Sequence, residues 1–287
     1  MKWLVPLLFP KFVREGAATY YEFRKRGTRM RILFVDQQPR TEKSVQPYDI
    51  AKIEALLNSY GSPGTEIEIG FPDDYAGSQL MNTIGGQSKL NGLHHMMETP
   101  SIVRKIFWAA ENGYDAVISS NTFDPGVDGG RLAVNIPVIG LHRAAMHAAL
   151  TLADRVGITV PLAPHVPYTW RLMRTIGLDR FISDIRPIGI YGADISQRGT
   201  EIFDTTVKVM RGLLDETRAE ILLPLGGAII PYVVDPKDLA KAVGAQVLNT
   251  KAIGIRFAEM CVACGMTQSA ITYPKARLSY QDFVQGG

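Results

Sequence analysis

From residue 30 onward, the chain alternates short apolar runs with longer segments of helical spacing. Runs rich in strand-forming residues predict strands at 31–36, 65–71, 115–121, 136–141, 157–163, 182–190, 219–227 and 245–250. Amphipathic segments between them predict helices at 50–61, 101–113, 143–157, 167–177, 200–218 and 251–265. The helix at 101–113 is expected to begin with Ser101 as its N-cap and to end at Gly113.

This order of strands and helices predicts the fold class. Alternating strands and helices form βαβ units, and strands that are almost continuously apolar indicate a parallel sheet covered on both faces. The pattern occurs twice, which predicts an α/β chain of two similar lobes, each a mainly parallel sheet flanked by helices, with the active-site cleft between them. We expect lobe 1 to comprise residues 30–142 plus 251–287, and lobe 2 residues 143–250. Residues 1–29 are interpreted as an N-terminal extension that packs on the domain or on a neighbouring subunit.

Charge and composition exclude several classes of partner. The net charge of the 287 residues is +3, with Lys and Arg scattered among Asp and Glu, so no nucleic acid partner is expected. No apolar run approaches the ~20 residues that span a bilayer, so no membrane partner is expected. The two cysteines, Cys261 and Cys264, do not form a disulfide scaffold and favour a reducing cytoplasm. Both are expected to be buried apolar thiols, and the five histidines lack metal-ligand spacing.

Ligands of open parallel sheets bind at the carboxyl ends of the strands. The polar residues and glycines expected there are Asp36, Gln37, Ser120, Asn121, Thr122, His142, His165, Gly226 and Gly227. His142 and His165 could transfer protons near neutral pH, and Asp36 could act as a base or hold an amino or ureido group. For each of these three, the alternative is a structural residue beside a turn.

The remaining candidates are interpreted as binding groups. Ser120, Asn121 and Thr122, together with Gln37, are suited to hold a carboxylate or an imide carbonyl. The Gly226–Gly227 turn allows a close approach of an anion, although it could equally be a tight packing turn. His94 and His95 fall in the polar stretch 77–99, which we interpret as a surface loop that could cover the cleft as a flap.

One segment carries a resemblance to a known family. It contains Asp124–Pro125–Gly126, then Arg131, then Ile136–Pro137–Val138 with Gly140, and then an Ala-rich helix at 144–149. In order and spacing, it resembles the aspartate/glutamate/hydantoin racemase superfamily, and most of all its hydantoin and allantoin racemase branch. The similarity extends over roughly residues 30–275, which implies a shared fold.

The resemblance also implies a chemistry. Those enzymes need no cofactor and use two cysteines on opposite faces of the substrate. The first of these positions falls here on Asn121, or on Ser120 if the Cys-Asn-Thr pattern of glutamate racemases is aligned, and the second falls on Gly226. The usual Asn-Pro-Asn-Thr after the first strand is replaced by residues 36–39, Asp-Gln-Gln-Pro. A thiol-based mechanism is therefore not expected.

Three functional hypotheses stay open. The first is a cofactor-independent racemase or isomerase for a small carboxylate, hydantoin or ureide, which would use His142, His165 or Asp36 as acid/base groups. The second is a hydrolase or lyase for a similar ligand, because one base and an oxyanion site suffice there. The third is a non-catalytic binding protein of the same fold. A homo-oligomer that binds a small molecule is expected in each case.

Overall fold

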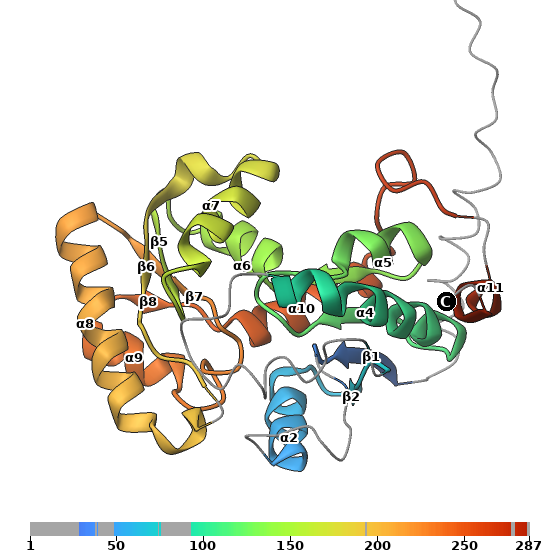
Figure 1. The fold of residues 1–287 in the computed structure, drawn as a ribbon, viewed down its shortest axis with the longest axis horizontal. Helices are drawn as coiled ribbons and strands as arrows, with labels where there is room; N and C mark the ends of the chain where they lie inside the picture. The colour runs from blue at the N-terminus through green and yellow to red at the C-terminus, as the bar shows by residue number, and fades with distance from the viewer. Residues whose placement is uncertain are drawn as a thin grey trace, which may run out of the picture.

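The computed structural model describes residues 29–37, 39, 49–73, 75, 93–192, 194–276 and 279–285. These residues form two α/β units that lie side by side (Figure 1). The predicted N-terminal extension, residue 29 excepted, and residues 77–92 of the predicted flap lie outside the described residues. The packing of the extension and the closing of a flap stay predictions.

The first unit contains a four-stranded parallel sheet of order β2-β1-β3-β4. Its strands are β1 (Met30–Val35), β2 (Thr65–Gly70), β3 (Ala116–Ser119) and β4 (Val138–Gly140). Its helices are α2 (Ile50–Tyr60), α4 (Leu93–Glu111), α5 (Val127–Ala133) and α6 (Leu141–Leu150), joined late in the chain by α10 (Thr250–Ala263) and α11 (Tyr280–Gln285). Val35 pairs with both Gly70 and Ser119, so three strands end together at one edge of the sheet.

The second unit repeats this arrangement, with a parallel sheet of order β6-β5-β7-β8. Its strands are β5 (Val156–Val160), β6 (Ile182–Pro187), β7 (Ile221–Pro224) and β8 (Gln246–Val247). Its helices are α7 (His165–Thr175), α8 (Gly199–Thr217) and α9 (Pro236–Val243), with short 3-10 turns at Asp179–Phe181 and Ile195–Gln197. In both units, the strand that comes first in the chain lies second in the sheet.

Both faces of each sheet are covered, which explains the nearly continuous apolar strands. In β1, Ile32 and Phe34 face a core shared with α2, α6 and α10, whereas Leu33 and Val35 face a core shared with α4 and α5. Helix α6 joins the units. Its Ala144 packs in the core of the first unit, and its Met146 packs in that of the second.

The predicted fold class is confirmed, since the two similar α/β units each have a parallel sheet flanked by helices. All eight predicted strands lie within three residues of their expected starts. The exact division of the chain between the lobes stays a prediction. Within the described part of the chain, every helix is too short or too polar to cross a bilayer.

The local structure departs from the sequence-based predictions in three places. The helix expected from Ser101 begins at Leu93 and continues through Pro100, so His95 lies in a helix and not in a surface loop. Helix α5, which lies in the Gly-rich segment after Gly126, and helix α9 were not among the predicted helices. The reason for the first error is physical: proline normally ends a helix, but the turns that precede Pro100 are held by the burial of His95 and Glu98.

Candidate functional site

The order in which the strands are connected indicates at which edge of each sheet a ligand is expected to bind. From β1 the chain continues to one side of the first sheet, and from β3 it continues to the other side. The carboxyl ends of β1 and β3 therefore form a switch point of the kind where ligands bind in open α/β sheets, and β5 and β7 form the equivalent one. Asp36 and Gln37 follow β1, residues 120–122 follow β3, and residues 225–227 follow β7.

The two switch points meet at the junction of the units. The backbone N–H of Gly226 donates a hydrogen bond to Thr122 Oγ1 at 2.7 Å. Gly226 has a φ of +97°, a conformation that favours glycine. A Cβ on Gly227 would lie 3.2 Å from the carbonyl oxygen of Ser120. The turns at 120–122 and 226–227, both predicted as binding elements, are thus brought into contact.

A buried carboxyl cluster, which we define as Gln37, His95, Glu98 and Asn121, lies next to this contact. Asn121 Oδ1 accepts a hydrogen bond from the N–H of Phe123, which turns the amide Nδ2 toward the cluster. Asn121 Nδ2 lies 3.4 Å from Glu98 Oε1, contacts His95 Nδ1 at 3.2 Å and donates to Gln37 Oε1. His95 Nδ1 and Glu98 Oε1 are 3.0 Å apart. Asn121 therefore organises the cluster from the end of β3.

Burial determines the charges in this cluster. Only 1% of the Glu98 surface is exposed, and its desolvation raises the pKa well above the ordinary value, aided by the negative charge of Asp36. Burial lowers the pKa of His95 to about 4. His95 is therefore uncharged at neutral pH, and burial favours the neutral form of the Glu98 carboxyl group.

Lys251 contacts the turn at 120–122 from the start of helix α10. The side chain of Asn249 accepts hydrogen bonds from the N–H groups of Lys251 and Ala252, which fixes the start of α10. Lys251 is 1% exposed, and its Nζ donates to the carbonyl oxygen of Ser120. The same nitrogen is 5.0 Å from the ring centroid of Phe34, and a Cβ on Gly227 would lie 2.6 Å from it. The amine thus fills the space between the two turns.

Burial also changes the protonation of Lys251. Desolvation lowers its pKa to about 7, although the negative charges of Asp36 and Asp124 oppose this shift. The charge of Asp36, a predicted site residue, acts on both Lys251 and Glu98. A substantial fraction of Lys251 is a free amine at neutral pH.

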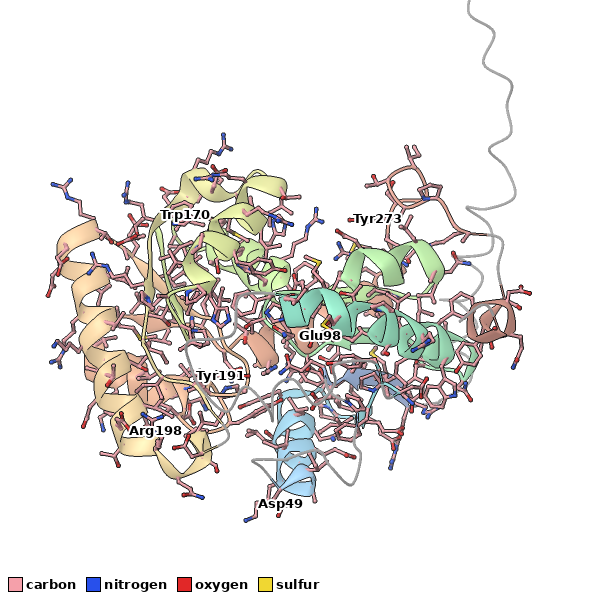
Figure 2. The ribbon with its side chains drawn as sticks, viewed as in Figure 1. Asp49, Glu98, Trp170, Tyr191, Arg198 and Tyr273 are labelled. Carbon is pink, nitrogen blue, oxygen red and sulfur yellow. The ribbon has the colours of Figure 1, made fainter. Side chains whose placement is uncertain are left out.

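The second unit contributes His165 and Tyr191. His165 is the first residue of α7, and its Nδ1 accepts a hydrogen bond from the N–H of Leu162 at 3.3 Å. Its ring centroid lies 4.9 Å from that of Phe123 and 6.4 Å from that of His95. Tyr191 hydrogen-bonds with Gln37, and burial raises its pKa to about 12. Figure 2 shows Glu98 and Tyr191 close to the junction, one from each unit.

His142 has a different position. It lies in the first turn of α6, where Asp124 Oδ1 accepts a hydrogen bond from its N–H at 2.9 Å. The side chain is buried, which lowers its pKa to about 3, and its Nε2 has no hydrogen-bond partner among the described residues. Among the described residues, the hydrogen bond of His142 connects it to Asp124 and not to the carboxyl cluster or Lys251.

The two cysteines lie far from this site. Cys261 is buried in a core of the first unit, whereas Cys264 at the end of α10 is exposed, so the prediction of two buried thiols was wrong for Cys264. Cys261 follows Lys251 by ten residues on α10, which corresponds to about 15 Å at 1.5 Å per residue. Within the described ranges, no three His, Cys, Asp or Glu side chains are grouped as metal ligands.

Sequence reasoning missed three residues of the site. Lys251 follows directly after the last predicted strand, so the strand-end criterion used for the other candidates would have found it. Glu98 and His95 left no such signal, because Pro100 made their segment look like a loop. A buried charge in the first turn of a helix is also unexpected, since lysine is rarely fully buried.

Comparisons with known proteins agree with this architecture. The model of the family described as Asp/Glu/Hydantoin racemase matches residues 93–258. A protein of Rhizobium meliloti named hydantoin racemase is 26% identical over 191 residues, which cover 65% of this chain and 77% of that protein. Solved structures of allantoin racemases from Pseudomonas fluorescens and Klebsiella pneumoniae superpose with TM-scores of 0.73 and 0.72 at 21% and 20% identity. They cover 87% and 88% of this chain and 98% of each structure, which shows a common fold.

Proposed function

Because the chain belongs to the Asp/Glu/hydantoin racemase family, which confirms the resemblance drawn from its sequence, we propose that it is a cofactor-independent isomerase of a small carboxylate, hydantoin or ureide. The substrate class is taken from the relatives, which are named hydantoin racemase and allantoin racemase. The chain inverts a carbon centre next to a carbonyl group by removing a proton from one face and returning one to the other.

The observation that carries this proposal is the contact between the turns at 120–122 and 226–227, made by Thr122 and Gly226. These turns hold the two positions at which the resemblance places the proton-transferring groups. Inversion requires acid/base groups on both faces of one carbon, since a single base returns the proton to the same face. Two units that meet at their switch points supply such a pair of faces.

The polar groups at the junction would hold the ligand. Ser120, Asn121, Thr122 and Gln37 offer hydroxyl and amide groups to a carboxylate or an imide, and the 226–227 turn allows its close approach. No thiol takes part, because both cysteines belong to the far end of α10. Asp36 from the first unit and His165 from the second stay candidates for proton transfer. His142 stays a candidate, although its pKa of about 3 keeps it uncharged.

Proton exchange in D2O tests the function. Allantoin, 5-substituted hydantoins and short amino or hydroxy acids are incubated with the protein and followed by proton NMR. Deuterium at the α-carbon, together with loss of optical activity and no consumption, is the expected result. A sample without protein corrects for spontaneous exchange. If no compound exchanges and none raises the melting temperature, the proposed substrate class is wrong.

One feature of the site favours a lyase or hydrolase as the second candidate. The carboxyl cluster belongs to the first unit, and the turn that Thr122 contacts across the junction consists of Gly226 and Gly227, which carry no acid/base side chain. Such one-sided chemistry suffices to cleave a bond. Consumption of the substrate in the same NMR experiment would favour this candidate, and thermal stabilisation without any reaction would favour a binding protein.

A further inference from the structure

Lys251 and Glu98 are both buried and can both transfer a proton. Each has only 1% of its surface exposed, and each carries a group that can transfer a proton. They come from different helices, α10 and α4, yet they contact consecutive residues. Lys251 Nζ donates to the carbonyl oxygen of Ser120, and Glu98 Oε1 lies 3.4 Å from the Nδ2 of Asn121.

We propose that Lys251 and Glu98 are the acid/base pair of this site, one on each face of the substrate carbon. The inference rests on the proposed isomerase function. In one direction, the amine of Lys251 takes the proton as the C–H bond breaks, and the carboxyl group of Glu98 donates its proton as the new C–H bond forms. The site then holds an ammonium and a carboxylate, and it returns to its starting state when the first loses and the second gains a proton through solvent. The reverse direction starts from that charged state.

The surroundings of Lys251 favour a free amine. The rings of Phe34 and Tyr232 lie 5.0 and 5.3 Å from Nζ, where they exclude water from the amine, although their faces also attract an ammonium. The charged groups that act on it are Asp36 after β1 and Asp124 after β3, and both stabilise the ammonium. Burial outweighs them, which leaves the pKa near 7.

The surroundings of Glu98 favour a neutral carboxyl group. It faces His95 on its own helix and Asn121 after β3. The charge of Asp36 disfavours the carboxylate, and Glu98 in turn acts on Tyr168 and Tyr191 of the second unit. The amine and the carboxyl group are thus shifted toward a common pKa range. Proton transfer in both directions requires such matching, because neither group then holds the proton too tightly.

A purely structural role explains these residues less well. A buried ammonium pays a desolvation cost, and its hydrogen bond to one neutral carbonyl returns only part of it. A methionine of similar length would fill the same space without that cost. Lys251→Met and Glu98→Gln are therefore expected to fold, and urea denaturation of both variants checks this.

The test measures proton exchange of each enantiomer separately. Wild-type protein and the two variants are incubated in D2O with the pure R or S form of a compound that the wild type isomerises. Lys251→Met is expected to lose exchange of one enantiomer by at least about 100-fold, and Glu98→Gln that of the other, while each keeps the opposite exchange. Glu259→Gln, a buried carboxylate on α10 held by Ser62 and Thr65, serves as control and changes neither rate by more than about twofold. A folded variant that keeps both exchanges, or loses both equally, overturns the proposal.

A second measurement needs no substrate and separates this inference from the proposed function. The side-chain carbons of ¹³C-labelled lysine are followed by NMR during a pH titration, with Lys251→Met to assign the signal. We expect Lys251 to titrate near 7 and to shift by less than about 0.3 pH unit in Glu98→Gln, because the charges that act on Lys251 are those of Asp36 and Asp124. Titration near the ordinary ~10.4, or a fall of about one unit in Glu98→Gln, overturns the pair. If the wild type isomerises none of the compounds, the proposed function fails, and this titration still decides whether the pair exists.

Discussion

The N–H group of Gly226 and the hydroxyl oxygen of Thr122 form a 2.7 Å hydrogen bond across the junction of the two units. The side chain of Thr122 is fully buried, and the two residues are 104 positions apart in the chain. The bond fixes the turn after β3 against the turn after β7.

Thr122→Val is expected to destabilise the protein. Valine has nearly the shape of threonine but cannot accept the hydrogen bond, so the buried N–H of Gly226 loses its partner. Such a loss costs about 1–3 kcal/mol of unfolding free energy, which urea denaturation measures. Thr122→Ser, which keeps the oxygen, should lose less. Equal stability of Thr122→Val and the wild type would show that this contact does not hold the units together.

Gly227→Ala is expected to displace the amine of Lys251, because the new Cβ would lie 2.6 Å from Nζ. We expect a loss of at least about tenfold in the rate of proton exchange, since misplacing a reacting group by about 1 Å has large effects. Gly199→Ala at the start of α8 is a matched control, because its Cβ would meet only Val233 at 3.7 Å among the described residues. If both variants react at the wild-type rate, Lys251 is not at the reaction centre.

The buried His142 predicts a loss of stability in acid. Burial lowers its folded-state pKa from 6.5 to about 3, so the stability gained by keeping it neutral is fully present above pH 6.5 and is lost as the pH falls toward 3. The slope for one such proton is about 1.4 kcal/mol per pH unit. His142→Met should remove this slope in urea denaturation between pH 7 and 4.5. His147→Met, an exposed histidine of the same helix, should keep it, and parallel curves for His142→Met and the wild type would contradict the prediction.

Removal of both thiols is expected to leave the activity unchanged. In a Cys261→Ala, Cys264→Ser double variant, the rate of proton exchange should stay within about twofold of the wild type, because Cys261 lies about 15 Å along α10 from Lys251. Iodoacetamide should label Cys264 faster than the buried Cys261 in the wild type. A loss of activity that follows labelling of either cysteine would restore a thiol mechanism.

Much of the fold could be predicted because its strands carry a strong local signal. A strand such as Ile32–Val35 is apolar at every position, since helices cover both faces of its sheet. The repetition of strand and helix then predicts the two units. Helices α5 and α9 were missed because they are only seven and eight residues long, and α5 contains two glycines.

The candidate site could be predicted only in part. Asp36, Ser120 to Thr122, and Gly226 to Gly227 follow strands whose ends are visible in the sequence, and the parallel pairing brings them to one edge. Glu98 and Lys251 could not be assigned in this way. Their shifted pKa values come from burial. Nothing in the sequence around Glu98 indicates that this helix turn is covered by the second unit.

The sequence by itself determined the two α/β units, the strand-end turns and the absence of a thiol from them, because hydrophobic period, turn residues and residue identity are local properties. Only the tertiary structure decided which ionisable groups are desolvated. Desolvation depends on neighbours that come from distant parts of the chain: Ser120 and Phe34 around Lys251, and Asp36 and Asn121 around Glu98. Those neighbours lower the pKa of Lys251 to about 7 and raise the pKa of Glu98 well above its ordinary value.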